Sequence, residues 1–214
     1  MPFLVKPVLA SGALAGVPQP TLPAADGLVL RPWRVEDAPA VHAAFQDPAM
    51  HQWHMRACGS EEEAAGWIAE WQAAWAGRGG PVGRRGRADG RTAGPVALRQ
   101  ILLGDGVAEV AYWTVARSRG QGVAARAAAA LSHWAFEEIG FHRLELFHAT
   151  ANEASCRVAV KAGFALEGTK RSALRHQDGW HDMHFHGRVR GTEPRADRVA
   201  RGAHRGGRGR SGTA

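Results

Sequence analysis

The residues Arg117 to Ala124, with the sequence RSRGQGVA, lie between a segment with strand character and a segment with helix character. Residues 109–115 alternate and are rich in β-formers, whereas residues 123–138 follow an alanine-rich helical pattern. In such a unit the first amides of the helix have no partner within the helix, and the helix dipole adds partial positive charge there. Gly120 and Gly122 carry no Cβ, so a ligand can approach the main chain closely. The pattern therefore predicts a phosphate site.

Two common phosphate motifs do not fit this loop. No Gly-Lys-Ser/Thr follows the glycines, which excludes a P-loop, and Ala125 stands where the dinucleotide fingerprint needs its third glycine. Arg117 and Arg119 add positive charge and forked hydrogen-bond donors to the loop. On these local grounds alone, a tight turn without a ligand is an equally open interpretation.

The loop and a second block together resemble a known family. Arg117-Ser118-Arg119-Gly120-Gln121-Gly122 matches, at every specified position, the Arg/Gln-x-x-Gly-x-Gly/Ala phosphate loop of the GNAT superfamily of acyl-CoA-dependent N-acyltransferases. Farther along, a strand over residues 141–146 precedes Asn152 and Ser155, and a short helix closes on Gly163-Phe164. That order is similar to the branch of ribosomal-protein N-terminal acetyltransferases. The resemblance covers roughly residues 28 to 190.

The resemblance implies a mixed α/β domain of the GNAT type. Its central sheet is mostly antiparallel, two adjacent parallel strands splay apart, and helices flank the sheet. We expect a disordered, proline-rich leader over residues 1–27, the acetyltransferase domain over 28–190, and a disordered tail rich in arginine and glycine over 191–214. Within the domain, the glycine-rich stretch 77–94 encodes a strand poorly and is expected to form a mobile loop.

Acetyl-CoA is the acyl donor that the resemblance implies. The pantetheine arm is expected in the gap between strands 109–115 and 143–149, and the pyrophosphate is expected on the loop amides. The implied cofactor-binding residues are Trp113, Thr114, Val115, Arg117, Arg119, Gly120, Gln121, Gly122, Val123, Ala124, Asn152 and Ser155. Without the resemblance, Asn152 is an ordinary helix cap and Ser155 an exposed helical serine.

The catalytic groups are assigned by the same comparison. Many relatives carry a tyrosine in the short helix as general acid, but this chain has Val158-Ala159-Val160 there. Ser155, or a water molecule that it holds, is therefore the candidate proton donor to the departing thiolate. Glu109, at the start of the splayed strand, is the candidate general base, with a solvated carboxylate at a strand edge as the equal alternative.

The histidines form another set of candidates. His148, His176, His181, His184 and His186 are further possible bases. His184 and His186 alternate on one strand and share a face, as two metal ligands would, but the sequence shows no third ligand at a known spacing. We therefore expect ordinary sheet histidines and no metal.

A helix is predicted from about Glu61 to Trp75, because Ser60 to Glu63 forms a capping box. Trp67, Trp71 and Trp75 recur every four residues on it, a spacing that favours core packing over substrate contact. Two residues of the preceding loop are weaker candidates for the acceptor side, since the early helices flank the acceptor groove in the resembled family. These two residues are Trp53 and His54.

Charge and cysteine content limit the partners and the cellular compartment expected for this protein. The net charge of +7 lies almost wholly in residues 77–91 and 191–214, so the rest of the chain is near neutral. Arginines among glycines in the tail suit weak contact with RNA, but no aromatic residue lies between them to stack on bases, so a solvated basic tail is favoured over a nucleic-acid site. Cys58 and Cys156 form no framework, which fits the cytoplasm, and no apolar run is long enough to cross a membrane.

The sequence thus predicts an acetyl-CoA-dependent N-acetyltransferase that transfers the acetyl group directly to a primary amine. The acceptor is either a protein N-terminus or a small molecule, and the chain is a monomer or a homodimer. A non-catalytic GNAT module that binds acyl-CoA or a protein partner is the alternative function.

Overall fold

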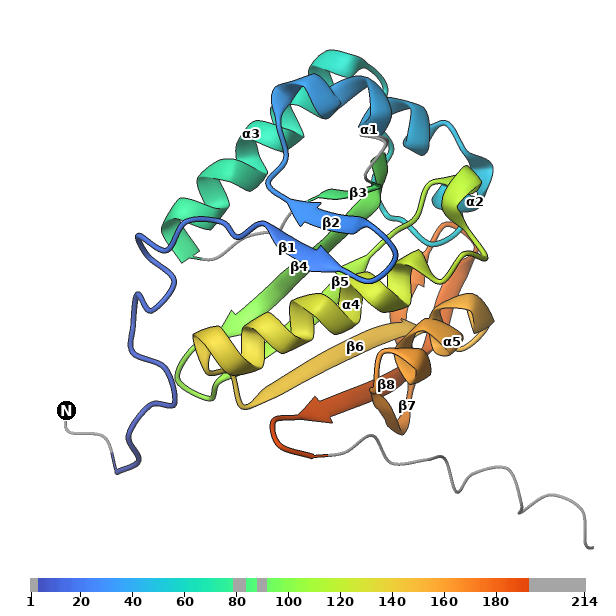
Figure 1. The fold of residues 1–214 in the computed structure, drawn as a ribbon. Coiled ribbons are helices and arrows are strands. Elements are labelled where there is room, and N and C mark those ends of the chain that lie inside the picture. Colours follow the sequence, from blue (N-terminus) through green and yellow to red (C-terminus); the bar gives the residue numbers. More distant parts are fainter. Residues whose placement is uncertain (1–3, 79–83, 88–91, 193–214) are drawn as a thin grey trace, which may run out of the picture.

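The computed structural model describes residues 4–78, 84–87 and 92–192, and within these ranges eight strands form one sheet. The strand order is β1-β2-β3-β4-β5-β6-β8-β7, and every neighbouring pair is antiparallel except β5 and β6 (Figure 1). This arrangement confirms the predicted mixed α/β class with a mostly antiparallel sheet. The strands are β1 (Leu22–Ala24), β2 (Leu28–Arg31), β3 (Arg84–Arg87), β4 (Thr92–Leu102), β5 (Val107–Tyr112), β6 (Arg143–Ala149), β7 (Ala165–His176) and β8 (Gly179–Val189).

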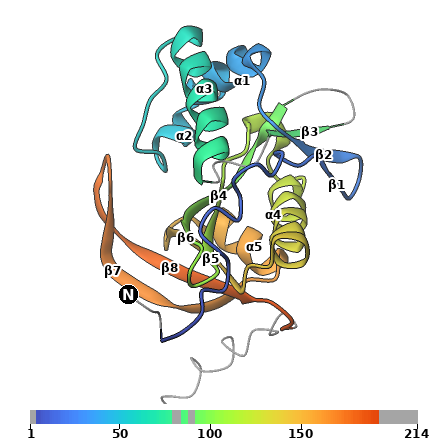
Figure 2. The same cartoon turned by 90° about the vertical axis from the view of Figure 1, so that its left-hand side faces the viewer.

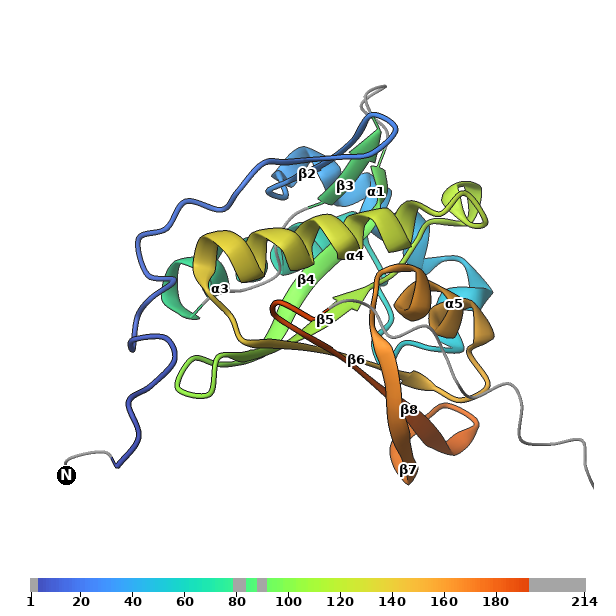
Figure 3. The same cartoon turned by 60° about the horizontal axis from the view of Figure 1, so that its bottom comes forward.

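Five α-helices surround the described sheet in two groups. Figure 2 shows α4 and α5 on one side of the strands, whereas α1, α2 and α3 gather at one end of the molecule. Figure 3 shows that α4 and α5 begin at the same end of the sheet. The helices are α1 (Ala38–Phe45), α2 (Pro48–His51), α3 (Glu61–Arg78), α4 (Val123–Trp134, continued by a π-helical turn to Ile139) and α5 (Glu153–Lys161). None of the described helices is long and apolar enough to span a bilayer.

Two hydrophobic clusters hold these layers together. The larger lies between the sheet and α4, where Val110, Leu131 and Leu144 are almost fully buried. The smaller joins α1 and α3 to the end of β2 through Trp33, Val41 and other apolar side chains. Burial of this much apolar surface supplies the main favourable term for folding, since each large side chain contributes about 1.5–3 kcal/mol.

Helix α3 begins and packs as its sequence predicts. The Ser60 hydroxyl accepts a hydrogen bond from the Glu63 amide, at 3.1 Å, which completes one half of the capping box. Trp67 and Trp75 are buried, and Trp71 packs against Trp33 with ring centroids 5.4 Å apart. The stripe of tryptophans is therefore part of the core.

The segment before β2 differs from the expected disordered leader. Leu9 and Leu14 are buried in the larger cluster, and the amides of Val8 and Leu9 donate to the carbonyls of Gly104 and Leu103. The Trp75 indole also donates to the Val17 carbonyl at 2.8 Å. Leu9 and Leu14 are therefore part of the core rather than of a disordered leader. The turn after β4 provides the carbonyl groups that hold this segment in place.

The stretch 77–94 is also more ordered in part than its glycines predicted. Residues 84–87 form strand β3, which pairs with β2 on one side and β4 on the other. Residues 79–83 and 88–91 lie outside the described part of the chain. Two neighbouring strands stabilise β3 by main-chain hydrogen bonds, which overrides its poor intrinsic propensity.

The parallel pair β5 and β6 opens as predicted. The two strands pair only from Val107 with Arg143 to Glu109 with Glu145, whereas β6 pairs with β8 along its whole length. Beyond Glu109, β5 stays with β4, and the amide of Val115 donates to the carbonyl of Ala93. A gap between β5 and β6 therefore widens toward the end where α4 and α5 begin.

Candidate active site

The predicted phosphate loop forms a compact turn at the start of α4. A short 3-10 turn over Ala116–Ser118 leads into two glycines with left-handed backbone, Gly120 at φ 75° and Gly122 at φ 68°. Gly122 is the N-cap residue, and no side chain caps this end of α4. The amides of the first helical turn therefore lack a protein cap, and the left-handed conformation explains why glycine is needed at both positions.

Both loop arginines brace the loop in this structure. Arg117 donates to the carbonyl of Thr92 at 2.9 Å, and Arg119 donates through Nε to the carbonyl of Thr114 at 3.1 Å. Arg119 also pairs with Asp47, at 2.5 Å, which ties the loop to the N-terminus of α2. Their direct role in phosphate binding, expected from the sequence, remains a prediction.

A shallow hollow lies beside the loop and was not anticipated from the sequence. It is lined by Gly122, Ala125, Arg126, Ala129 and Lys161. Arg126 from α4 and Lys161 from the end of α5 bring two cationic side chains to its rim, close to the N-terminus of α4. Two positive charges beside uncapped amides suit a ligand that carries several phosphates.

The three residues expected along the pantetheine arm are not equivalent. Val115 uses its amide for Ala93 and its carbonyl for the Ser118 amide, so its main chain is already bonded within the protein. The Trp113 ring packs against Phe45 and Trp33 in the smaller cluster. The Thr114 carbonyl accepts the Arg119 bond. Val115 is therefore a poorer candidate for ligand contact than the sequence indicated.

The start of α5 brings Asn152 and Ser155 to the mouth of the gap. Asn152 is the N-cap residue, and its side-chain oxygen accepts a hydrogen bond from the Ser155 amide at 3.0 Å. The Ser155 hydroxyl lies 2.6 Å from the hydroxyl of Tyr112, at the end of β5. This contact joins the two sides of the gap, and it supplies a phenol where the sequence of α5 offered none.

Glu109 lies where the parallel pairing of β5 and β6 ends. It is half-buried and sits opposite Arg99 on β4 and Glu145 on β6. Burial raises the pKa of the Glu109 carboxyl above its usual range, and the Arg99 charge opposes this rise only in part. A carboxyl group with a raised pKa is a better proton acceptor near neutral pH than an exposed one.

The predicted acceptor-side residues meet the tip of the β7–β8 hairpin. The Trp53 ring packs against His176 and His181, with centroids 5.8 and 6.2 Å away. Burial lowers the pKa of His54 to about 4, and the positive charge of Arg99 lowers it further. The loop after α2, the hairpin tip and the Arg99 side of the sheet therefore lie together.

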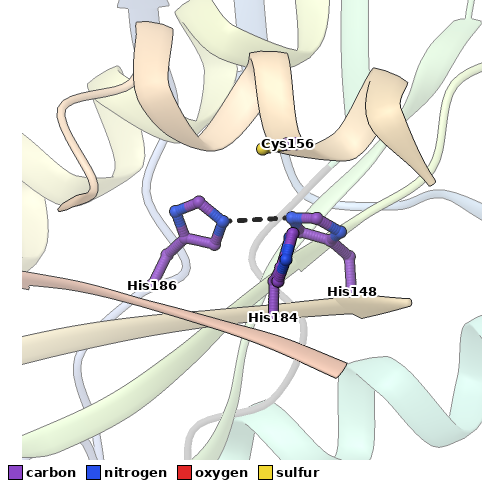
Figure 4. Close-up of side chains that lie close together, drawn as sticks. All are labelled: His148, Cys156, His184 and His186. Carbon is purple, nitrogen blue, oxygen red and sulfur yellow. Dashed lines mark hydrogen bonds between the residues drawn. The ribbon is translucent and has the colours of Figure 1, made fainter. Parts of the chain in front are cut away.

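Of the five candidate histidines, the remaining three lie together between the sheet and α5. His148 on β6 lies across from His184 on β8, His186 lies two residues farther along β8, and Cys156 on α5 faces all three (Figure 4). The sequence had indicated only a pair, because His148 and Cys156 belong to other elements. The pairing of β6 with β8 decides this juxtaposition.

Three relevant residues were thus missed by sequence reasoning. Tyr112 is the only tyrosine of the chain, and the local pattern indicates it only as part of a strand. Arg126 and Lys161 belong to helices whose packing brings them together. Tyr112 could have been found in the sequence, because it is the only tyrosine and lies just before the phosphate loop. No comparable sequence signal marks Arg126 or Lys161.

Comparison with known proteins agrees with this geometry. Residues 27–165 match the family model described as an acetyltransferase (GNAT) domain. A putative ribosomal N-acetyltransferase of Bacillus subtilis is 31% identical over 98 residues, which cover 46% of this chain and 54% of the relative. A ribosomal-protein-serine acetyltransferase of Escherichia coli is 28% identical over 96 residues, covering 45% of this chain and 54% of the relative. The matched part thus spans about half the length of these curated relatives.

Solved structures share the fold. RimJ of Mycobacterium smegmatis, in complex with a coenzyme A disulfide, superposes with a TM-score of 0.71 at 23% identity, covering 79% of this chain and 86% of RimJ. The family that the phosphate loop and the Asn152–Ser155 block predicted is confirmed by the family model, which covers more than half of the chain. The protein belongs to the GNAT family of acetyltransferases.

Proposed function

We propose that this protein is an acetyl-CoA-dependent N-acetyltransferase that transfers the acetyl group directly to a primary amine within a ternary complex. The observation that carries the proposal is the Tyr112–Ser155 hydrogen bond, which joins the two sides of the gap between β5 and β6 near the uncapped start of α4. Family membership and the coenzyme A complexes of structural relatives support the choice of donor.

The proposed donor lies along the gap with its phosphates at α4. The amides of Gly122, Val123 and Ala124 would hold the pyrophosphate, because they are at the positive end of the helix dipole. Arg126 and Lys161 would contact the remaining phosphate of coenzyme A from the adjoining hollow. The pantetheine arm would bond, like an added strand, to the main chain of Trp113 and Thr114, which directly follow β5.

The proton for the departing thiolate would come from Tyr112 through Ser155. A thiol titrates near 8.5 and a phenol near 10, so this transfer is uphill by only about 2 kcal/mol. An aliphatic hydroxyl is a far weaker acid than a phenol, so Ser155 alone is a poor donor. The 2.6 Å contact lets Ser155 pass a proton to the sulfur as it takes one from Tyr112.

Glu109 is the proposed general base. By strand alternation its side chain leaves β5 on the face opposite to that of Tyr112, so acid and base would flank a thioester lying in the gap. Glu109 is three residues from Tyr112, or about 10 Å along the strand, so it would act on the amine through water. The raised pKa of its carboxyl fits this role.

The acceptor belongs to the same proposal. Two of the curated relatives are described as ribosomal or ribosomal-protein-serine acetyltransferases, which favours a protein N-terminus over a small amine. The loop of Trp53 and His54 and the hairpin tip would then receive the peptide, on the face of the sheet away from α4. The transfer needs no metal, and both cysteines are free thiols, as a cytoplasmic enzyme would keep them.

Thiol release from acetyl-CoA tests this function directly. We expect release that depends on a peptide with a free N-terminus, with intersecting initial-rate patterns and no acetylated enzyme when the amine is omitted. Tight coenzyme A binding without thiol release, over a broad panel of peptides, polyamines and amino sugars, would instead identify a non-catalytic acyl-CoA-binding module. An acetyl group found on Cys58 or Cys156 would refute direct transfer.

A further inference from the structure

The histidine cluster between α5 and the sheet has the composition of a metal centre. His148, His184, His186 and Cys156 each offer one ligand atom, and these four atoms all lie within 4.8 Å of one another. Figure 4 shows the three rings rising from the strands and the sulfur above them on α5. His148 and His186 are buried, and His184 and Cys156 are half-buried.

We propose that His148, His184, His186 and Cys156 bind one Zn²⁺ ion, which fastens the first turn of α5 to strands β6 and β8. Three imidazoles and one thiolate form a ligand set that zinc accepts in tetrahedral sites. Zinc–ligand bonds of about 2.0–2.3 Å place neighbouring ligand atoms about 3.3–3.6 Å apart. The Nε2 atoms of His148 and His186 are already 3.1 Å apart, so closing the rest of the site takes only small side-chain movements.

The environment of His148 prepares it as a ligand. Its Nδ1 donates a hydrogen bond to the carbonyl of Ala149, at 2.8 Å, because a carbonyl oxygen can only accept. In the neutral ring this leaves the lone pair on Nε2, which faces the cluster. Metal-binding histidines typically have their second nitrogen held in this way, which sets the ring orientation.

The cluster offers neutral ring nitrogens, one of which lacks a hydrogen-bond partner. Burial lowers the pKa of His148 to about 4, and the nearby His186 and His184 lower it further, so this ring is held neutral. The Nδ1 atom of His184 is buried and has no hydrogen-bond partner within the described part of the chain. Buried polar atoms normally have such a partner, and a metal ion would supply one.

Proton balance accompanies the binding. Cys156 binds as a thiolate, so its thiol proton is released to solvent when the Zn–S bond forms. Because neutral His148 keeps its proton on Nδ1, its 3.1 Å contact with His186 requires a proton on Nε2 of His186 in the metal-free protein. On binding, that proton moves to Nδ1 of His186, and both Nε2 lone pairs then face the metal.

At this location a zinc ion would have a structural role, because it would hold the first turn of α5 in place. Cys156 follows Ser155 directly and lies one turn from the Asn152 cap, so a bond to Cys156 would hold the part of α5 that contacts Tyr112. The described chain has one other cluster of possible ligands, His176, Asp178 and His181 at the hairpin tip. Asp178 and His181 are already paired at 2.7 Å there, and the cluster contains no cysteine.

Cobalt titration of tag-free protein tests the proposal, because tetrahedral Co²⁺ reports its ligands by absorption. We expect one Co²⁺ per chain, visible bands of tetrahedral intensity, a thiolate-to-cobalt band in the near ultraviolet, and displacement by one equivalent of Zn²⁺. Cys156→Ser should abolish the thiolate band and weaken Zn²⁺ affinity by at least ~10-fold. Cys58→Ser changes the only other cysteine, which is buried in the smaller hydrophobic cluster, and should match the wild type.

A second measurement separates metal binding from misfolding. Zn²⁺ should raise the Tm of the wild type and of Cys58→Ser, but not that of Cys156→Ser or His184→Gln, while all four proteins show the same circular dichroism without metal. A wild-type protein without tetrahedral cobalt bands overturns the proposal. So does a thiolate band that survives Cys156→Ser, or binding that is lost only in Asp178→Asn.

Discussion

Replacing Tyr112 by Phe tests the proposed route of the proton. The change removes one hydroxyl group, whose bond to Ser155 is 2.6 Å long, and leaves the ring in place. If this hydroxyl served only as a neutral hydrogen bond, its loss would cost about 0.5–1.5 kcal/mol, or at most about a tenfold change in rate. A general acid contributes about 10²–10⁴-fold, so the two roles differ measurably.

We therefore expect Tyr112→Phe to lower kcat by about 10²-fold or more, while the Kd for coenzyme A changes only a few-fold. Thiol release at saturating acetyl-CoA and peptide measures kcat, and calorimetry measures the Kd. Unfolding in urea should show a loss of only about 1 kcal/mol, so the protein remains folded in the assay.

A double-mutant cycle with Ser155→Ala sharpens the result. If Tyr112 and Ser155 pass one proton, the double variant should be about as slow as the slower single variant, because the two residues act as a unit. Ser132→Ala is the matched control, since it removes a buried serine hydroxyl, bonded to the Ala128 carbonyl, from the middle of α4. Its kcat should equal that of the wild type. A less than tenfold effect of Tyr112→Phe, or multiplicative effects in the cycle, would refute the relay.

Three further predictions concern charge and backbone conformation. The pKa of Glu109 is raised in the folded protein, so its stabilising contribution is present at low pH and is lost as the pH rises through that pKa. Glu109→Gln should therefore leave the free energy of unfolding at pH 7.5 equal or higher, while kcat falls about 10²-fold. A fall in both the free energy of unfolding and kcat would contradict the assignment of Glu109 as the base. Gly122→Ala forces alanine into the left-handed region at a cost of about 1–2 kcal/mol and should weaken coenzyme A binding, as measured by calorimetry. Gly104→Ala is the control: its new Cβ meets no atom within 4 Å, so coenzyme A binding should be unchanged. His54 and His148 have pKa values lowered to about 4, so the metal-free protein should lose stability as pH falls from about 6.5 to about 4, and flat urea midpoints over that range would show that these rings are not held neutral.

Local sequence patterns determined much of this protein. The glycines at 120 and 122, the capping box before α3 and the Asn152 cap each act through residues at most a few positions away, so their structures follow from neighbours in the chain. The glycine turn between β5 and α4 was therefore placed correctly, and the family and the mixed, mostly antiparallel sheet were predicted correctly with it. Strand β6 was predicted with its observed bounds, because its alternation is strong.

Tertiary structure alone decided which distant side chains meet. Tyr112 and Ser155 are 43 residues apart, and His148 and His186 are 38 apart. Their contacts depend on strand register and on how α5 packs across the sheet, and neither leaves a mark in local propensity. Burial of Leu9 and Leu14 likewise depends on the larger cluster, which is formed by residues distant in the sequence. The chain thus encodes its candidate phosphate-binding turn in eight consecutive residues, whereas its candidate acid and its candidate metal centre arise only from the pairing of the strands and the packing of α5 on the sheet.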